Sequence, residues 1–178
     1  MKKITSLAIL TYMLFMNTTL LADDKTFSAF VYTPSTSDGS LEGYEFDGGG
    51  MLGMVFGNKK LFSDSLGSYG SFDMSYNSVD ETDSSDAIYG YRIFNLGVTY
   101  SPSDSVTLLA GMGISWEYGE MFSRGTHYET EEKEINTNLH IGLAYNVTDK
   151  YGAIITYNTA SSSMGIGIIG NFWWICLT

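Results

Sequence analysis

Apolar residues recur at every second position along this chain, in about eight segments of about ten residues each. In segment 106–118 the even-numbered positions are apolar throughout, whereas the odd-numbered ones are small or polar except at Leu109. A period of two predicts β-strands with one face against an apolar phase. The predicted strands cover residues 26–33, 44–57, 67–79, 88–100, 106–118, 133–145, 151–160 and 163–174. Eight strands of this kind indicate an all-β fold, an eight-stranded antiparallel up-and-down transmembrane β-barrel.

One predicted strand, 88–100, breaks this phase. Tyr91 and Ile93 share one face, while Phe94, Leu96 and Val98 share the other. The change predicts a bulge near Ile93–Phe94, or else a wrong assignment of one end of the strand.

The N-terminus carries an export signal. Lys2 and Lys3 precede an apolar stretch over residues 4–16, and a cleavage site follows at Ala22. The apolar stretch is shorter than the roughly 20 residues that a membrane helix needs. We therefore predict a signal peptide over 1–22 and a barrel domain over 23–178, located in the outer membrane of a Gram-negative cell envelope.

The charge is strongly negative and unevenly distributed. Without residues 1–22 the chain has seven basic and 20 acidic residues, a net charge of −13. Nucleic-acid binding is disfavoured, because it requires clustered Lys and Arg. The connections 34–43 and 119–134 are the longest, and together with 80–87 they hold −9 of this charge. Since outer-membrane barrels have short periplasmic turns and longer extracellular loops, we expect these three loops outside the cell.

Aromatic residues lie near the predicted strand ends, where two interface girdles are expected. The inner girdle is predicted to contain Phe56, Tyr69, Tyr100, Tyr145, Tyr151, Phe172 and Trp174. The outer girdle is predicted to contain Phe46, Tyr76, Tyr89, Tyr91, Trp116, Tyr118 and Tyr157.

Over about residues 23–174 the chain resembles the small eight-stranded outer-membrane barrels, such as the OmpA transmembrane domain and OmpX. The resemblance is one of pattern. Its most specific part is the turn Tyr100-Ser101-Pro102, followed by the apolar, glycine-containing strand 109–113. The resemblance implies a monomeric barrel in outer-membrane lipid and lipopolysaccharide, with no wide channel.

Four ionisable residues are predicted to face the lumen, namely Asp73, Arg92, Glu117 and His140. Eight strands enclose a space that side chains fill, and buried charges must pair. We expect Arg92 and the carboxylates to form a structural network that plugs the lumen. A proton- or ion-conducting gate is the alternative.

Four alternative functions are nucleotide binding, lipid A modification, ligand binding inside a soluble barrel and cation bridging. The motif G-x-G-x-x-G at 165–170 lacks the downstream helix that nucleotide binding needs, so its small residues are expected to face a narrow lumen or permit curvature. His127 and His140 leave a lipid A-modifying enzyme as an alternative. A soluble lipocalin-like barrel is another, with its apolar faces turned inward. The acidic run 80–86 lacks the ligand spacing of an EF-hand. The alternative for these carboxylates is weak binding of Ca²⁺ or Mg²⁺ that bridges to lipopolysaccharide.

The favoured hypothesis is an integral outer-membrane protein with a structural or surface-interaction role. It predicts no catalytic residue, no cofactor and no metal site, and an extracellular ligand bound through the acidic loops.

Overall fold

The computed structural model describes residues 25–36, 39–41, 44–46, 49–75, 77–81, 85–123, 126–132 and 135–170. Side chains are described over 25–36, 49–75, 90–118 and 135–170. No helix among these residues has the length and apolar character of a membrane span.

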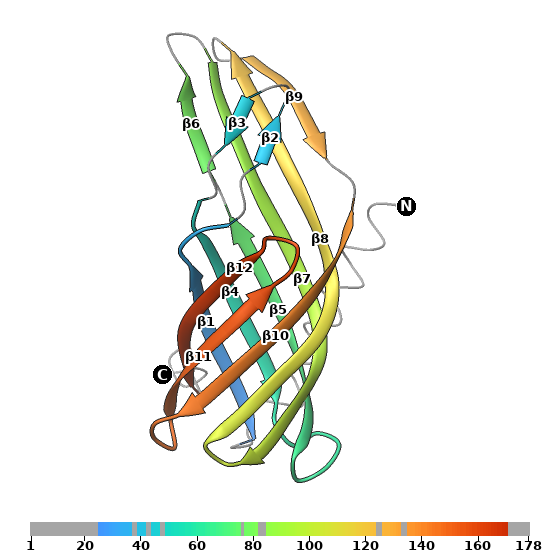
Figure 1. The fold of residues 1–178 in the computed structure, drawn as a ribbon, viewed down its shortest axis with the longest axis vertical. Coiled ribbons are helices and arrows are strands. Elements are labelled where there is room, and N and C mark those ends of the chain that lie inside the picture. Colours follow the sequence, from blue (N-terminus) through green and yellow to red (C-terminus); the bar gives the residue numbers. More distant parts are fainter. Residues whose placement is uncertain are drawn as a thin grey trace, which may run out of the picture.

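The described chain closes into an antiparallel barrel of eight strands (Figure 1). The barrel strands are β1 (Thr26–Thr33), β4 (Met51–Asn58), β5 (Leu66–Ser75), β7 (Ser85–Ser103), β8 (Val106–Ser123), β10 (Asn136–Asn146), β11 (Tyr151–Asn158) and β12 (Ser163–Gly170). The first barrel strand, β1, pairs with the last, β12, and pairing between β7 and β8 completes the ring. The predicted fold class is confirmed.

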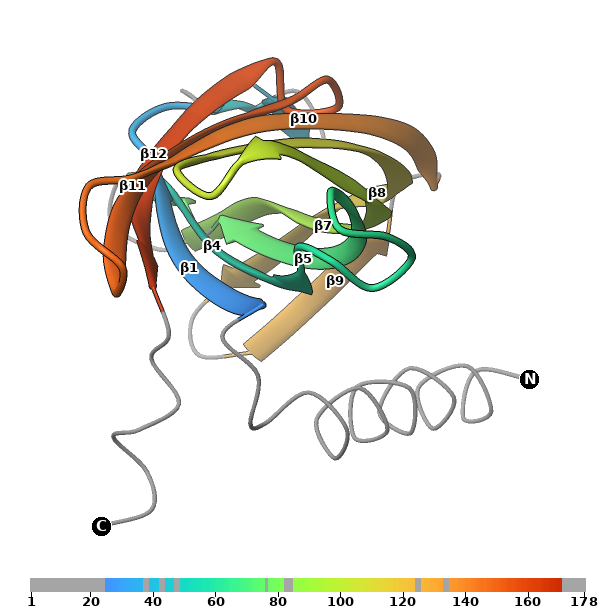
Figure 2. The ribbon, with the colours of Figure 1, turned by 90° about the horizontal axis from the view of Figure 1, so that it is seen from below.

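The two ends of the barrel differ. At one end the connections are short turns over residues 59–65, 104–105 and 147–150. This short-turn end also holds the start of β1 and the end of β12, which pair with each other (Figure 2). At the opposite end β7 and β8 continue well beyond the other barrel strands, with lengths of 19 and 18 residues (Figure 1).

The extended end is built from strands, which corrects the predicted long loops. β6 (Asn77–Glu81) pairs with β7, β9 (Thr126–Glu132) pairs with β8, and β2 (Gly39–Leu41) pairs with β3 (Tyr44–Phe46). Connections 80–87 and 119–134 are therefore mostly strand. The sequence of these segments lacks a regular alternation of apolar and polar residues, so the pattern that identified the other strands is missing although the backbone ladder continues.

The predicted bulge near Ile93–Phe94 is wrong. β7 keeps one register with β8 from Ser85↔Ser123 to Tyr100↔Leu108, and it shifts only beyond Tyr100. Tyr91 and Ile93 are buried on the same face as Asn95. The apparent break arises because Tyr91 and Ile93 are apolar side chains of the lumen, and a filled lumen accepts apolar side chains as well as polar ones.

The apolar phase of each strand faces outward. Large exposed hydrophobic residues occur on all eight barrel strands, for example Phe30, Met54, Met74, Leu96, Met112, Ile141, Ile155 and Ile168. The alternating residues are buried inside the barrel. This arrangement is the reverse of a lipocalin-like barrel, in which the apolar faces would line the interior.

Candidate functional site

The lumen is filled by side chains in two layers. Toward the short-turn end lies an apolar cluster, formed by Phe27, Ala29, Val31, Val55, Tyr69, Leu109, Ala144, Ile154 and Ile169. Each of these side chains is almost completely buried. Alternation explains their position, since each occupies the inward phase of its strand.

The second layer is a network of three buried asparagines. Asn138 Nδ2 donates to Asn158 Oδ1 at 2.7 Å and lies 2.7 Å from Asn95 Oδ1. Asn95 Nδ2 donates to Ser71 Oγ at 2.9 Å and to Asn158 Oδ1 at 3.3 Å. Asn158 Nδ2 in turn lies 3.5 Å from Asp73 Oδ2. Because these amides satisfy one another, the layer ties together β5, β7, β10 and β11.

Tyr69 and His140 join the two layers. Tyr69 Oη lies 2.8 Å from His140 Nδ1, and the two rings are 5.4 Å apart between centroids. The tyrosine ring lies across two glycines, since a Cβ placed on Gly97 or Gly111 would come within 2.5 Å of it. The small residues of β7 and β8 thus make room for a large lumen side chain.

The predicted lumen charges are only partly brought together. Asp73 and His140 are buried in the lumen, and Glu117 follows Ser115 on the inward phase of β8. The assignment of Arg92 to the lumen is wrong, because it falls on the outward phase of β7 with Phe94 and Leu96. Its guanidinium lies 4.2 Å from the centroid of the Tyr118 ring, a cation–π contact on the outer surface. The Asn158 amide, rather than arginine, faces the Asp73 carboxyl.

The asparagine network was not predicted as a unit. All three asparagines stand on inward positions of their strands, and that placement is the signal by which the sequence reveals them. Asparagine carries both donors and acceptors, so three of them suffice to form a closed network.

The predicted girdle residues do not all lie on the outer surface. Tyr100, Tyr145 and Tyr151 are exposed on the outside near the short-turn end, and Phe56, Trp116 and Tyr157 are partly exposed on outward positions. Tyr118 also faces outward but is covered, and its Oη donates to Ser75 O at 3.0 Å. Tyr69 and Tyr91 are buried in the lumen, so their assignment to girdles is wrong. The remaining girdle residues lie outside the described side chains: Phe46, Tyr76, Tyr89, Phe172 and Trp174.

The other candidate chemistry has little structural support. His127 lies on β9, and its side chain is outside the described residues, whereas His140 is enclosed in the lumen. No group of three or more His, Cys, Asp or Glu residues suited to a metal ion occurs in the described part of the chain. The G-x-G-x-x-G segment lies within extended β12 rather than at a strand-to-helix turn.

Comparison with known proteins identifies the fold. No protein-family model and no curated protein matches the chain. Among solved structures, Ail, the attachment invasion locus protein of Yersinia pestis, in complex with the heparin analogue sucrose octasulfate, matches with a TM-score of 0.62 at 18% identity, over 82% of this chain and 94% of that one. A second structure of Ail matches with a TM-score of 0.57 at 17% identity, over 82% and 93% of the two chains. This chain thus has the fold of the small eight-stranded outer-membrane β-barrels.

Proposed function

We propose that this protein is an integral outer-membrane barrel, exported by residues 1–22, with a structural or surface-interaction role and no catalytic role. The observation that carries the proposal is the belt of exposed apolar side chains around a closed ladder. Soluble monomers rarely expose apolar patches beyond a few hundred Å². A closed barrel also satisfies its backbone groups internally, as lipid requires.

The proposed orientation places the extended end outside the cell and the short-turn end in the periplasm. Long extracellular and short periplasmic connections are usual for such barrels. The charge distribution supports this direction, since connections 34–43, 80–87 and 119–134 at the extended end hold a net charge of −9.

The acidic extended end favours a cationic partner outside the cell. The Ail structure was solved with a polyanion, sucrose octasulfate. A surface rich in carboxylates would repel such a ligand and attract basic proteins, or divalent cations that bridge to lipopolysaccharide. The proposed contact surface is therefore the β6–β7–β8–β9 extension.

Charge removal on this extension tests the proposed contact. Changing Glu129, Glu131 and Glu132 to glutamine should weaken binding of nanodisc-embedded protein to immobilised polylysine, and binding should also decrease with added salt. Biosensor titrations measure the effect, with Asp64→Asn and Asp104→Asn at the opposite end as control. Equal binding by the triple variant and the wild type would contradict the assignment of this surface.

The filled lumen predicts the absence of a porin-sized channel. The apolar cluster and the asparagine layer occupy the interior, consistent with the narrow bore of eight strands. In planar bilayers, purified protein should give no conductance steps on the scale of a 16-stranded porin measured in parallel. Porin-sized steps from the wild-type protein would show that the lumen opens.

A further inference from the structure

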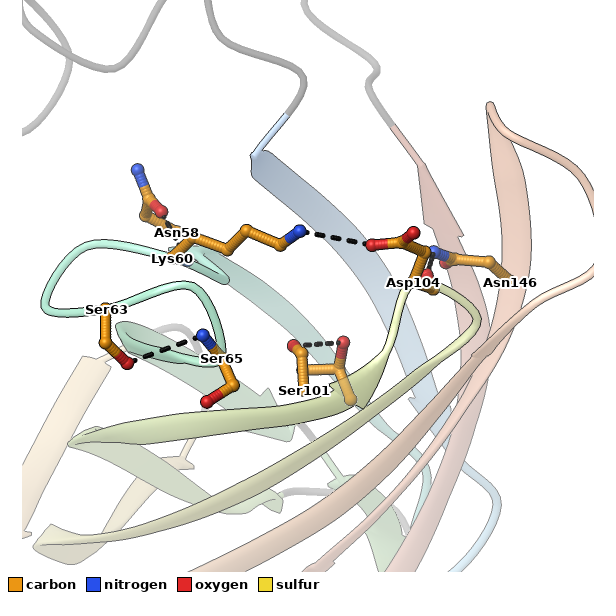
Figure 3. A network of polar contacts seen from close by, with 8 residues as sticks. Asn58, Lys60, Ser63, Ser65, Ser101, Asp104 and Asn146 are labelled. Carbon is orange, nitrogen blue, oxygen red and sulfur yellow. Dashed lines mark hydrogen bonds and ion pairs between the residues drawn. The ribbon is translucent and has the colours of Figure 1, made fainter.

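A second feature, outside the lumen network, is a cavity of about 400 Å³ at the short-turn end of the barrel. Its lining residues come from the start of β1, the end of β12 and the three turns. These elements lie together at one end of the barrel (Figures 2 and 3). Phe27 and Ile169, which belong to the apolar cluster, line it on the inner side. The cavity is therefore a cup with an apolar floor and polar walls.

The walls are unusually rich in lysine for this acidic chain. Lys25, Lys59, Lys60 and Lys150 line the cavity, and among the described residues Asp104 and Asp149 are the carboxylates of its lining. Beyond residues 1–22 the sequence has seven basic residues, so more than half of them gather here. The cup thus attracts anions, whereas the opposite end of the molecule repels them.

Hydrogen bonds donated by the backbone N–H groups of three of these lysines order the turns. Lys59 N donates to Lys25 O at 2.9 Å, Lys60 N donates to Asn58 Oδ1 at 2.8 Å, and Lys150 N donates to Thr148 Oγ1 at 3.3 Å. The turns that carry the lysines are thereby preorganised. A preorganised site loses less entropy when a ligand binds.

One lysine of the cup forms an ion pair that is open to solvent. Lys60 Nζ pairs with Asp104 Oδ1 at 3.1 Å, but the Asp104 side chain is 94% exposed, so solvent screens this ion pair (Figure 3). Lys59 is half-buried in the turn. Burial lowers its pKa from the ordinary value, Asp104 partly opposes that shift, and Lys60 adds to it. A bound anion would offset the cost of burying the Lys59 ammonium.

We propose that this cup binds a phosphate-bearing anion. Lysine ammonium groups are common phosphate ligands, and the hydroxyls of Ser103, Ser105 and Thr148 add donors around the walls. The volume lies within the range of about 300–1,000 Å³ that is typical of small-molecule pockets. Two sources share this chemistry, namely a free phosphorylated metabolite and the headgroup of an anionic phospholipid. The proposal does not depend on the extracellular role.

Calorimetry with pyrophosphate tests the site. The chain without residues 1–22 is placed in nanodiscs of phosphatidylcholine, and pyrophosphate is titrated into wild type, a Lys59→Gln/Lys150→Gln variant and an Arg92→Gln control. We expect saturable heat for wild type and control, and affinity at least about tenfold weaker for the double variant, because charge-assisted hydrogen bonds are lost. Circular dichroism checks that all three proteins are folded.

A second arm separates the two sources of phosphate. In nanodiscs containing phosphatidylglycerol, loss of the pyrophosphate heat would mean that lipid headgroups occupy the cup, whereas unchanged heat would favour a free ligand. Both results support a phosphate site. Absence of saturable heat for the wild type in phosphatidylcholine nanodiscs, or equal affinity of the folded double variant, would overturn the proposal.

Discussion

Replacing Ile141 with arginine is expected to lower the free energy of unfolding in a lipid bilayer by about 2–4 kcal/mol. Ile141 lies near the middle of β10, is paired with Ala110 and Tyr157, and is 57% exposed on the outer face. In the proposed membrane position this exposure is to hydrocarbon, where a guanidinium loses its hydration. Denaturant titration of the barrel in phosphatidylcholine vesicles, followed by tryptophan fluorescence, measures the change.

Val147→Arg provides the matched control, because Val147 is also exposed but lies in the turn that follows β10. Near the interface the same charge should cost only about 0–1 kcal/mol. Equal effects of the two substitutions would mean that Ile141 faces water rather than lipid.

Replacing Asn158 with alanine is expected to lower the free energy of unfolding by about 3 kcal/mol or more, which is the second large effect. Asn158 Oδ1 accepts hydrogen bonds from both Asn95 and Asn138, and its Nδ2 faces the Asp73 carboxyl. The substitution leaves several buried polar groups with fewer partners, each at a cost of about 1–3 kcal/mol, and also opens a cavity in the lumen. The same unfolding titration in vesicles measures the loss.

Asn136→Ala is the corresponding control. Asn136 is exposed at the start of β10, and the hydrogen bond it accepts from Ser115 goes to its backbone oxygen. Its replacement should change stability by less than about 0.5 kcal/mol. If Asn158→Ala were equally mild, the asparagine layer would not be a stabilising network.

The strands within the barrel were predictable because lipid and lumen impose opposite demands on alternate residues. The predicted strand 26–33 coincides with β1, and the predicted starts of β8, β11 and β12 match the structure. The eight-stranded count followed from the same alternation. Beyond the barrel that constraint ends, so the sequence pattern predicts loops for the extensions of β7 and β8, for the last two residues of β6 and for β9.

The lumen was less predictable, because its residues need only fit and satisfy one another. Because Tyr69 and Tyr91 are aromatic and near strand ends, the sequence pattern places them in the girdles, yet both side chains are buried in the lumen. Because Arg92 is charged, it is expected in the lumen, yet it lies on the outer surface against Tyr118. Position in the alternation decides these cases better than residue type, as the three inward asparagines also show.

Spin-label accessibility along β10 tests the central claim most directly. Single cysteines at 138–144, in a background with Cys176 replaced by serine, would be labelled and measured in bilayers with oxygen and with a water-soluble nickel chelate. Leu139, Ile141 and Leu143 are exposed, whereas Asn138, His140 and Ala144 are buried. The account predicts high oxygen and low nickel accessibility at the odd-numbered sites, and little of either at the even-numbered ones. High nickel accessibility at 139, 141 and 143 would contradict a lipid-facing outer surface.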